Sequence, residues 1–174
     1  QEIARTNLEK LRQTAPQWYP LAAYLSGKGF DLYRNTALRY LPTGEAYLED
    51  MLTTLDTAQR FIFLEYFIMA EGEIWDRLSD ILCRKSRQGV EVKLIFDDFG
   101  SMMRMPNEKI DALQDAGVEV RVFNPVHHYV NRLYFNYRDH RKITCVDGDI
   151  AYTGGANIAD EYANLIERFG YWKD

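Results

Sequence analysis

Cysteine and histidine are scarce in this sequence. Among its 174 residues only Cys83 and Cys145 are cysteines, and they do not form a Cys-x-x-Cys pair. This spacing excludes the common zinc ligand sets and a disulfide framework, so we expect two reduced, buried thiols. The histidines are His127, His128 and His140. Because an imidazole titrates near neutral pH, each is a candidate for acid–base or nucleophilic chemistry.

Long apolar runs and an excess of positive charge are also missing. The longest apolar run, residues 61–70, is interrupted by Glu65 and is much shorter than the roughly 18 residues that span a bilayer. No signal-peptide pattern is visible. With 21 Lys and Arg against 26 Asp and Glu, the net charge is −5, so no overall basic field attracts nucleic acid. The chain starts with Gln1 instead of Met, and we expect it to be part of a longer protein.

The remaining composition, 47% hydrophobic and 27% charged, is typical of a globular domain with a core. Residues 1–40 have the pattern of a helical lead-in segment without visible chemistry. From residue 41 the pattern becomes regular, and we expect one domain over residues 41–174. Helical and strand-like stretches alternate there, in the order 43–58 (helix), 60–69 (strand), 73–90 (helix), 90–97 (strand), 107–118 (helix) and 119–124 (strand).

This alternation predicts an α/β fold, with a mixed, largely parallel sheet that is flanked by helices on both faces. In such sheets, ligands tend to bind beyond the carboxyl ends of the strands. Glu65, Asp97 and Asp98 fall near such ends. We interpret these three acids first as solvated loop residues or helix caps, and only second as site residues.

A hairpin is predicted near the C-terminal end of the sequence. Two strand-like stretches, 141–146 and 150–155, flank Asp147-Gly148-Asp149. Asp-Gly between two strands is a strong hairpin signal, because the tight turn needs positive φ angles. The stretch 157–169 then has a helical pattern, and Asn157 is placed to cap its first turn.

Residues on both sides of this hairpin suggest an anion site. Side chains alternate along a strand, so His140 and Lys142 are expected to point the same way. An imidazole beside an ammonium is repulsive unless an anion lies between them. Gly154 and Gly155 would let the backbone approach a ligand closely. Asn157 would add an amide at the N-terminus of the expected helix, where exposed N–H groups favour anions.

The local charge supports the same interpretation. Between residues 127 and 142 the cations Arg132, Arg138, Arg141 and Lys142 are opposed only by Asp139. Taken alone, each site residue also has a structural explanation: a histidine that starts a strand, an asparagine that caps a helix, a glycine pair that turns the chain. The ordered combination of these residues is what favours a site for a phosphate.

The stretch "HRKITCVDGDIAYTGGAN", residues 140–157, resembles the HKD motif of the phospholipase D superfamily, H-x-K-x4-D-x6-G-[GS]-x-N. Upstream, "GVEVKLIFDDFGS" and "FIFLEYFI" are similar to stretches of bacterial cardiolipin synthases. The resemblance covers residues 40–174 and implies a phospholipase D-like half-domain. It further implies transfer of a phosphatidyl group, with two phosphatidylglycerol molecules giving cardiolipin, in a parent protein of the bacterial cell membrane whose fragment is soluble.

The resemblance also assigns roles. His140 would be the nucleophile, forming a phosphohistidine, or the general acid of the other half-reaction. Lys142 and Asn157 would hold the phosphate oxygens, with Gly154 and Gly155 beside them. Neither a metal nor another cofactor is expected, because the lysine supplies the positive charge. Where the family often has serine in the glycine pair, this sequence has Gly155.

Two carboxylates in the family's pattern are expected to support the site without binding the substrate. Asp147 belongs to the catalytic motif by name, but its place in the turn suggests that it fixes the hairpin and does not touch substrate. The family uses a further carboxylate to orient the histidine. Asp174 matches that position best, and Glu161 and Glu167 match it less well.

The family's site combines two such motifs, and this sequence has one, since His127-His128 does not form a second. The expected partner is therefore a second HKD half in the parent chain or a second copy of this chain, and the fragment alone is expected to be inactive. Two other functions stay open. One is a phosphodiesterase that cleaves nucleic acid as a dimer, which the net charge disfavours, and the other is a non-catalytic phosphate-binding module.

Overall fold

The computed structural model describes residues 2–126 and 136–173. The chain divides into two compact units, Gln1–Tyr40 and Leu41–Asp174. The first unit contains α1 (Glu2–Thr14), a 3-10 helix η1 (Pro16–Trp18) and α2 (Tyr19–Ser26). Asn7 ties its two ends together, because its side-chain amide donates to the Leu32 carbonyl oxygen at 2.7 Å.

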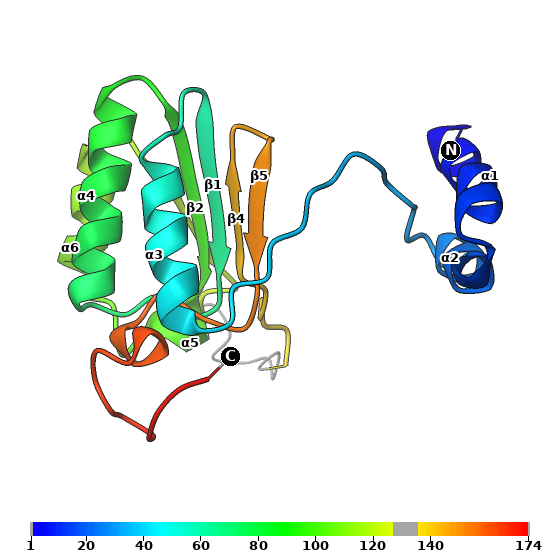
Figure 1. Cartoon of the computed structure of the whole chain (residues 1–174). Helices are drawn as coiled ribbons and strands as arrows, with labels where there is room; N and C mark the ends of the chain where they lie inside the picture. Colours follow the sequence, from blue (N-terminus) through cyan, green and yellow to red (C-terminus); the bar gives the residue numbers. More distant parts are fainter. Residues whose placement is uncertain (1, 127–135, 174) are drawn as a thin grey trace. The chain divides into compact units, whose positions relative to one another are not determined.

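The second unit is built on one five-stranded sheet, in the order β3-β2-β1-β4-β5 (Figure 1). β1, β2 and β3 are parallel, whereas β4 and β5 are antiparallel neighbours at the β1 side. The strands are β1 (Phe61–Tyr66), β2 (Glu91–Asp97), β3 (Glu119–Phe123), β4 (Ile143–Val146) and β5 (Ile150–Thr153). The helices are α3 (Gly44–Leu55), α4 (Glu73–Arg87), α5 (Asp98–Ser101), α6 (Asn107–Asp115) and a 3-10 helix η3 (Asp160–Ala163).

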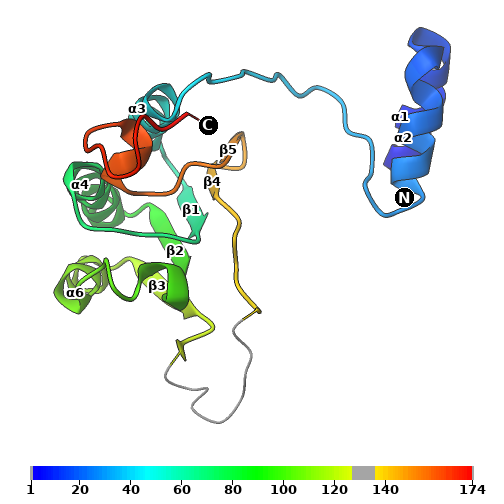
Figure 2. The ribbon, with the colours of Figure 1, turned by 90° about the horizontal axis from the view of Figure 1, so that it is seen from below.

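The expected α/β class with a mixed sheet is confirmed, but the cover of the sheet differs from the expectation. Viewed along the strands, α3, α4 and α6 all lie on one face (Figure 2). Both parallel crossovers run in the same direction across the sheet, and their common handedness puts α4 and α6 on the same side. The hairpin of β4 and β5 needs no crossover helix. Among the described residues of this unit, no helix covers the other face.

The core lies between the sheet and these three helices. Alternation along β1 points Ile62, Leu64 and Tyr66 into it. α4 contributes Trp75 and Leu78, both completely buried. The Tyr66 hydroxyl is buried as well and is paired with the hydroxyls of Tyr47, at 2.7 Å, and Thr144, at 2.8 Å. Burial raises the pKa of Tyr66 well above its ordinary value, so this network is neutral.

Strands β4 and β5 form the predicted hairpin. Asp147 and Gly148 both have positive φ, 55° and 77°, as the Asp-Gly turn requires. The carboxylate of Asp147 accepts three backbone N–H groups, those of Gln59, Arg60 and Phe61, at 2.7–2.8 Å. Its carbonyl oxygen accepts a further bond from the Arg60 guanidinium. The Asp147 side chain therefore fastens the turn to the start of β1.

Replacing Asp147 with alanine is expected to lower the melting temperature by several degrees, because three N–H groups lose their acceptor. The backbone N–H groups of Phe61 and Gln59 hold the pKa of Asp147 below its ordinary value. A lowered pKa contributes stability above the unfolded-state value, so the difference between the two proteins should shrink as the pH falls through the pKa of Asp147. Thermal unfolding at several pH values measures this. Asp149→Ala is the matched control, since Asp149 is exposed in the same turn and only approaches Arg60, at 3.7 Å.

The helix expected over residues 157–169 is wrong. The chain there is extended first, and Ile158 forms a parallel bridge with Met69. A short 3-10 helix, η3, follows, and Asn164 ends it in the left-handed conformation with a φ of 52°. The apolar spacing that looked helical is explained by packing, because Ile158, Ala159, Tyr162 and Ala163 are all buried. Asn157 is consequently not a helix cap.

Two smaller expectations concern cysteines and membrane helices. Cys83 and Cys145 are free, but they are only partly buried, which corrects the expectation of full burial. Burial raises the pKa of the Cys83 thiol, which keeps it protonated. Within residues 2–126 and 136–173, no helix has the length and apolar character needed to cross a bilayer.

Candidate active site

Five of the predicted site residues lie at one end of the sheet, where β1 and β2 finish and β4 begins (Figure 1). They are His140, Lys142, Gly154, Gly155 and Asn157. The last pairs of the β4 ladders are Ile143 with Glu65 of β1 and Ile143 with Thr153 of β5. The residues that follow these pairs therefore lie at the same edge: Lys142 before β4, Phe67 after β1, and Gly154 and Gly155 after β5. This is the carboxyl end of the parallel strands, where ligands were expected.

The side chains of His140 and Lys142 share the aromatic ring of Phe67. The His140 ring centroid is 4.8 Å from that of Phe67, and the Lys142 ammonium is 5.4 Å from it. His140 is exposed, whereas Lys142 is only 3% exposed. The structure thus places both residues beside Phe67, with the His140 side chain exposed and that of Lys142 buried.

Lys142 also contacts the backbone of its neighbour. Its ammonium donates to the carbonyl oxygen of His140 at 2.6 Å. A buried ammonium needs such acceptors, because an isolated charge at this depth would be strongly destabilising. This hydrogen bond also keeps the Lys142 side chain folded back towards His140.

Phe67 is itself supported from behind by α5. Ser101 is buried and donates from its hydroxyl to the Phe67 carbonyl oxygen at 3.3 Å, while accepting from the Met69 N–H at 3.0 Å. Gly100 lies so close that a Cβ at this position would enter the Phe67 carbonyl group. The close packing of Gly100 against Phe67 therefore fixes the position of the phenylalanine ring that contacts His140.

Asp97, the last residue of β2, is completely buried and holds the backbone that carries His140. One carboxylate oxygen accepts the N–H of Asp139 at 3.0 Å. The other oxygen faces the guanidinium of Arg138 at 3.3 Å and the N–H of Gly100 at 3.3 Å. Asp97 was interpreted from the sequence as a loop acid or a helix cap. It does cap α5, but it is not solvated, and it joins α5 to the residues just before His140.

A second acidic cluster lies beside it. Asp139 is 6% exposed, and its carboxylate accepts from the Arg141 side chain at 3.0 Å. Arg141 reaches Glu65 as well, at 2.6 Å. Burial, together with the hydrogen bond and charge of Asp139, raises the pKa of Glu65. Burial opposes ionisation of Asp139 too, but hydrogen bonds from Glu65 and Arg141 outweigh it and lower the pKa of Asp139. When the pair holds one proton, that proton therefore favours Glu65 over Asp139.

Changing Glu65 to glutamine should make the protein less sensitive to rising pH. A carboxyl whose pKa is raised by folding contributes stability at low pH, which is lost as the pH rises through the folded-state pKa. From about pH 4.5, the ordinary value for glutamate, the wild type should lose stability relative to Glu65→Gln. Thermal unfolding of both proteins across that range tests this. Glu119→Gln, on the same sheet face, should leave the slope unchanged, and equal slopes for all three proteins would contradict the shared proton.

Asn157 lies at the site but points inward. It is 2% exposed. Its amide oxygen accepts the N–H of Ile68 at 2.9 Å, and its amide nitrogen donates to the Tyr162 hydroxyl at 2.8 Å. The ring of Tyr162 in turn packs edge-on against Trp172, with centroids 4.5 Å apart. In this structure the asparagine fastens the 157–159 segment to the end of β1, one residue beyond Phe67.

The remaining predicted residues are placed as follows. Gly154 and Gly155 are exposed at the site edge. Asp147 follows β4 at the end opposite to Lys142, so the structure does not bring it to His140. Glu161 is buried against Arg104 at 2.7 Å. The other positions, Asp174, His127, His128 and Arg132, lie outside the described residues, as does any contact of Asp174 with His140.

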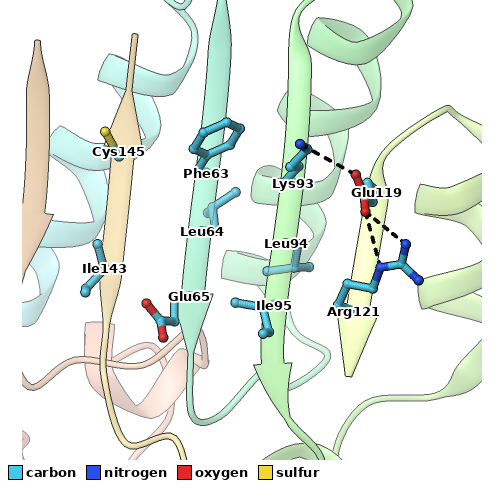
Figure 3. A pocket seen from close by; sticks show the side chains of 10 residues that line it. All are labelled: Phe63, Leu64, Glu65, Lys93, Leu94, Ile95, Glu119, Arg121, Ile143 and Cys145. Atoms are coloured by element: carbon cyan, nitrogen blue, oxygen red, sulfur yellow. Dashed lines mark hydrogen bonds and ion pairs between the residues drawn. The ribbon is translucent and has the colours of Figure 1, made fainter. Parts of the chain in front are cut away.

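The uncovered sheet face has a hollow of about 300 Å³, but it does not contain the site. Figure 3 shows its lining, with the helices behind the sheet and Phe63, Lys93 and Ile95 projecting forwards. Glu65 is the residue that links this face to the site, through Asp139 and Arg141. Within the described ranges, no group of three His, Cys, Asp or Glu side chains is arranged to hold a metal ion.

Fold and site together define a class. A mixed sheet with a histidine and a lysine at its carboxyl edge, followed by a hairpin and an asparagine, is a phospholipase D-like half-domain. A family model described as "Cardiolipin synthase, PLD-like domain" matches residues 51–166. The chain belongs to this family.

Curated relatives agree with the family. An uncharacterized protein of Streptococcus mutans is 44% identical over 168 residues, which are 96% of this chain and 36% of that protein. A cardiolipin synthase of Oceanobacillus iheyensis is 38% identical over 153 residues, or 88% of this chain and 30% of that protein. The chain thus spans about a third of the length of the curated relatives it matches.

Solved structures resemble the chain less closely. Nuc from Salmonella typhimurium, a phospholipase D family member, has a TM-score of 0.46 and 20% identity, covering 66% of each chain. NucT from Helicobacter pylori has a TM-score of 0.49 and 15% identity, covering 69% of this chain and 72% of its own.

Sequence reasoning missed three supporting residues. Phe67 was counted only as part of an apolar strand, and Asp139 only as a charge. Asp97 was interpreted as a solvated loop acid or a helix cap; it is the cap of α5, but its burial and its bond to the Asp139 N–H were missed. The signal for Asp97 is an acid that directly follows a buried apolar strand, since such a position is itself buried and needs partners.

Proposed function

We propose that this chain forms one half of a phosphatidyltransferase active site that makes cardiolipin from two phosphatidylglycerol molecules. The observation that carries the proposal is that the exposed imidazole of His140 and the buried ammonium of Lys142 contact the same Phe67 ring, on a backbone that Asp97 holds in place. A nucleophile open to solvent beside a fixed cation suits a phosphodiester, whose negative charge must be neutralised before attack.

In the proposed reaction, a neutral nitrogen of His140 attacks the phosphorus of the first phosphatidylglycerol. The bond from phosphorus to the headgroup oxygen breaks, and the glycerol leaves with a proton from an acid. A hydroxyl of the second phosphatidylglycerol then attacks the phosphohistidine, loses its proton to a base, and frees His140. Lys142 holds non-bridging oxygens during both displacements, and the exposed backbone at Gly154 and Gly155 lines the approach. For Asn157, the inward contacts support a role in fixing this backbone.

The acid and base of this scheme would come from a second histidine across the site. We propose that a second HKD half supplies it, because one exposed imidazole cannot be nucleophile and acid in the same step. A longer protein that contains both halves is the first candidate, given that the chain spans about a third of its relatives. A dimer of this chain is the alternative. A verified monomer of this chain should show no turnover, and robust turnover by that monomer would contradict the proposal.

The decisive experiment traps the covalent intermediate. The longer protein is incubated briefly with phosphatidylglycerol labelled with ³²P, quenched in alkali, and digested for mass spectrometry. We expect an acid-labile, alkali-stable label on the peptide that contains His140. A label on a different histidine would instead make His140 the general acid. A protein that binds phosphatidylglycerol but neither carries label nor releases glycerol would be a non-catalytic phosphate-binding module.

A further inference from the structure

In the first unit, α2 carries an apolar stripe that is exposed. No residue of α2 is buried. Trp18, Leu21, Tyr24 and Leu25 are 60%, 54%, 64% and 39% exposed. Successive members of this set are three, three and one residues apart, which puts all four on one side of a helix. The Phe30 N–H bonds to the Leu25 carbonyl oxygen, so the chain folds back at the helix end, and the Phe30 side chain is exposed too.

This apolar stripe belongs to a basic segment of an acidic protein. Residues 1–40 carry six Lys and Arg against three Asp and Glu, whereas residues 41–174 carry fifteen against twenty-three. Two of the six cations lie over aromatic rings of the unit: Arg12 is 5.4 Å from the Tyr19 ring, and Lys28 is 5.7 Å from the Tyr24 ring. A cation from α1 and a cation that follows α2 thus lie over aromatic rings of α2.

We propose that α2 lies flat on an anionic lipid bilayer, with Trp18, Leu21, Tyr24, Leu25 and Phe30 as its docking surface. Aromatic and leucine side chains partition into the boundary between headgroups and acyl chains, and nearby Lys and Arg are attracted by anionic headgroups. With eight residues, α2 is far too short to span a bilayer, so it can only lie in the interface.

Two other occupants fit less well. A second copy of this unit carries the same positive charge, which would repel it. Nucleic acid would use the cations, but its binding rests on phosphate contacts and gains little from an exposed apolar stripe. A bilayer of anionic lipid uses both features at once.

The test measures binding without turnover, so its outcome is independent of the proposed reaction. The whole chain is mixed with vesicles of 30% phosphatidylserine in phosphatidylcholine, with the same amount of phosphatidylglycerol instead, or of phosphatidylcholine alone, and binding is read by sedimentation. We expect similar binding to both anionic mixtures, because the attraction depends on the negative charge of the lipid and not on the chemistry of its headgroup. Binding to phosphatidylcholine alone should be much weaker. Binding to phosphatidylglycerol alone would overturn the proposal in favour of the reaction site.

Trp18 offers a direct reporter. Of the three tryptophans, Trp75 is fully buried and Trp172 is partly buried, so Trp18 is the most exposed. Vesicle binding should shift its emission to shorter wavelength, and brominated acyl chains should quench it. Trp18→Phe identifies the signal. Sedimentation with vesicles but no quenching of Trp18 would place the contact elsewhere and overturn the proposal.

Variants complete the design. The double change Leu21→Ser and Leu25→Ser should weaken binding at least about tenfold, since two apolar side chains no longer enter the interface. Lys28→Gln should weaken binding to anionic vesicles about fivefold and leave binding to phosphatidylcholine unchanged. Met103→Ser, which removes an exposed apolar side chain of the second unit, is the control and should bind normally. Equal binding by all variants, displacement of vesicles by a DNA duplex, or dimers abolished by the double change would each overturn the proposal.

Discussion

Replacing His140 with alanine should abolish turnover of phosphatidylglycerol, by about four orders of magnitude or more, in the longer protein that contains both halves. In the proposed mechanism the loss is this large because a His140 nitrogen attacks the phosphorus, and a neighbouring side chain cannot substitute for it. Stability should hardly change, within about 0.5 kcal/mol, because the side chain is exposed and its packing is limited to one face of Phe67.

Release of radioactive glycerol from headgroup-labelled substrate measures this loss, and thermal unfolding checks the fold. Lys142→Met is the companion variant. It should reduce turnover by roughly two to three orders of magnitude, since the phosphate loses one fixed cation but keeps its nucleophile. A His140→Ala protein that still releases glycerol at more than a few per cent of the normal rate would contradict the assigned role.

The second large effect is expected at a residue that does not touch the substrate. Asp97→Ala should destabilise the protein by about 3–5 kcal/mol. It leaves the guanidinium of Arg138 and the N–H groups of Asp139 and Gly100 without their buried acceptor. Denaturant unfolding measures it. Asp98→Ala is the matched control: Asp98 is less buried and, among the described residues, accepts the N–H of Val126, so about 1 kcal/mol is expected.

Asp97→Asn separates positioning from stability. Asparagine keeps the size and can still accept the Asp139 N–H, but it loses the ion pair with Arg138. If Asp97 positions His140, kcat should fall about tenfold with KM nearly unchanged, because binding of the lipid is preserved while the histidine is misaligned. A variant that is less stable but has normal kcat at a temperature where it is fully folded would show that the role is structural only.

Local signals predicted the hairpin and the direction of the side chains before it. Asp147-Gly148 encodes its own turn through two positive φ angles, and alternation then puts His140 and Lys142 on one side. The hydrogen-bond partners of Asp97 and Asn157 could not be predicted, because Asp139 and Ile68 are far away in sequence and meet them only in the folded chain. Among these residues, sequence spacing predicted side-chain direction but not side-chain partners.

Two expectations about helices were wrong, namely a helix over residues 157–169 and helices on both faces of the sheet, and both errors have physical causes. The apolar spacing over residues 157–169 fits a helix. In the structure this segment instead pairs with Met69 through Ile158, and its apolar residues as far as Ala163 are buried without forming an α-helix. The expected second layer of helices rested on the parallel strands alone. A sheet whose two crossovers have the same hand, and whose last strands form a hairpin, has one helical face within the described chain.

Gly100 has a consequence for genetics. It is in α5, behind Phe67, and a methyl group there would push the phenylalanine carbonyl away from its place under His140. A screen for lost function would therefore recover substitutions at this glycine alongside those at the reacting histidine. In a library of random variants, position 100 should tolerate substitution as poorly as a catalytic position does. Its role is only to leave room for the Phe67 carbonyl group.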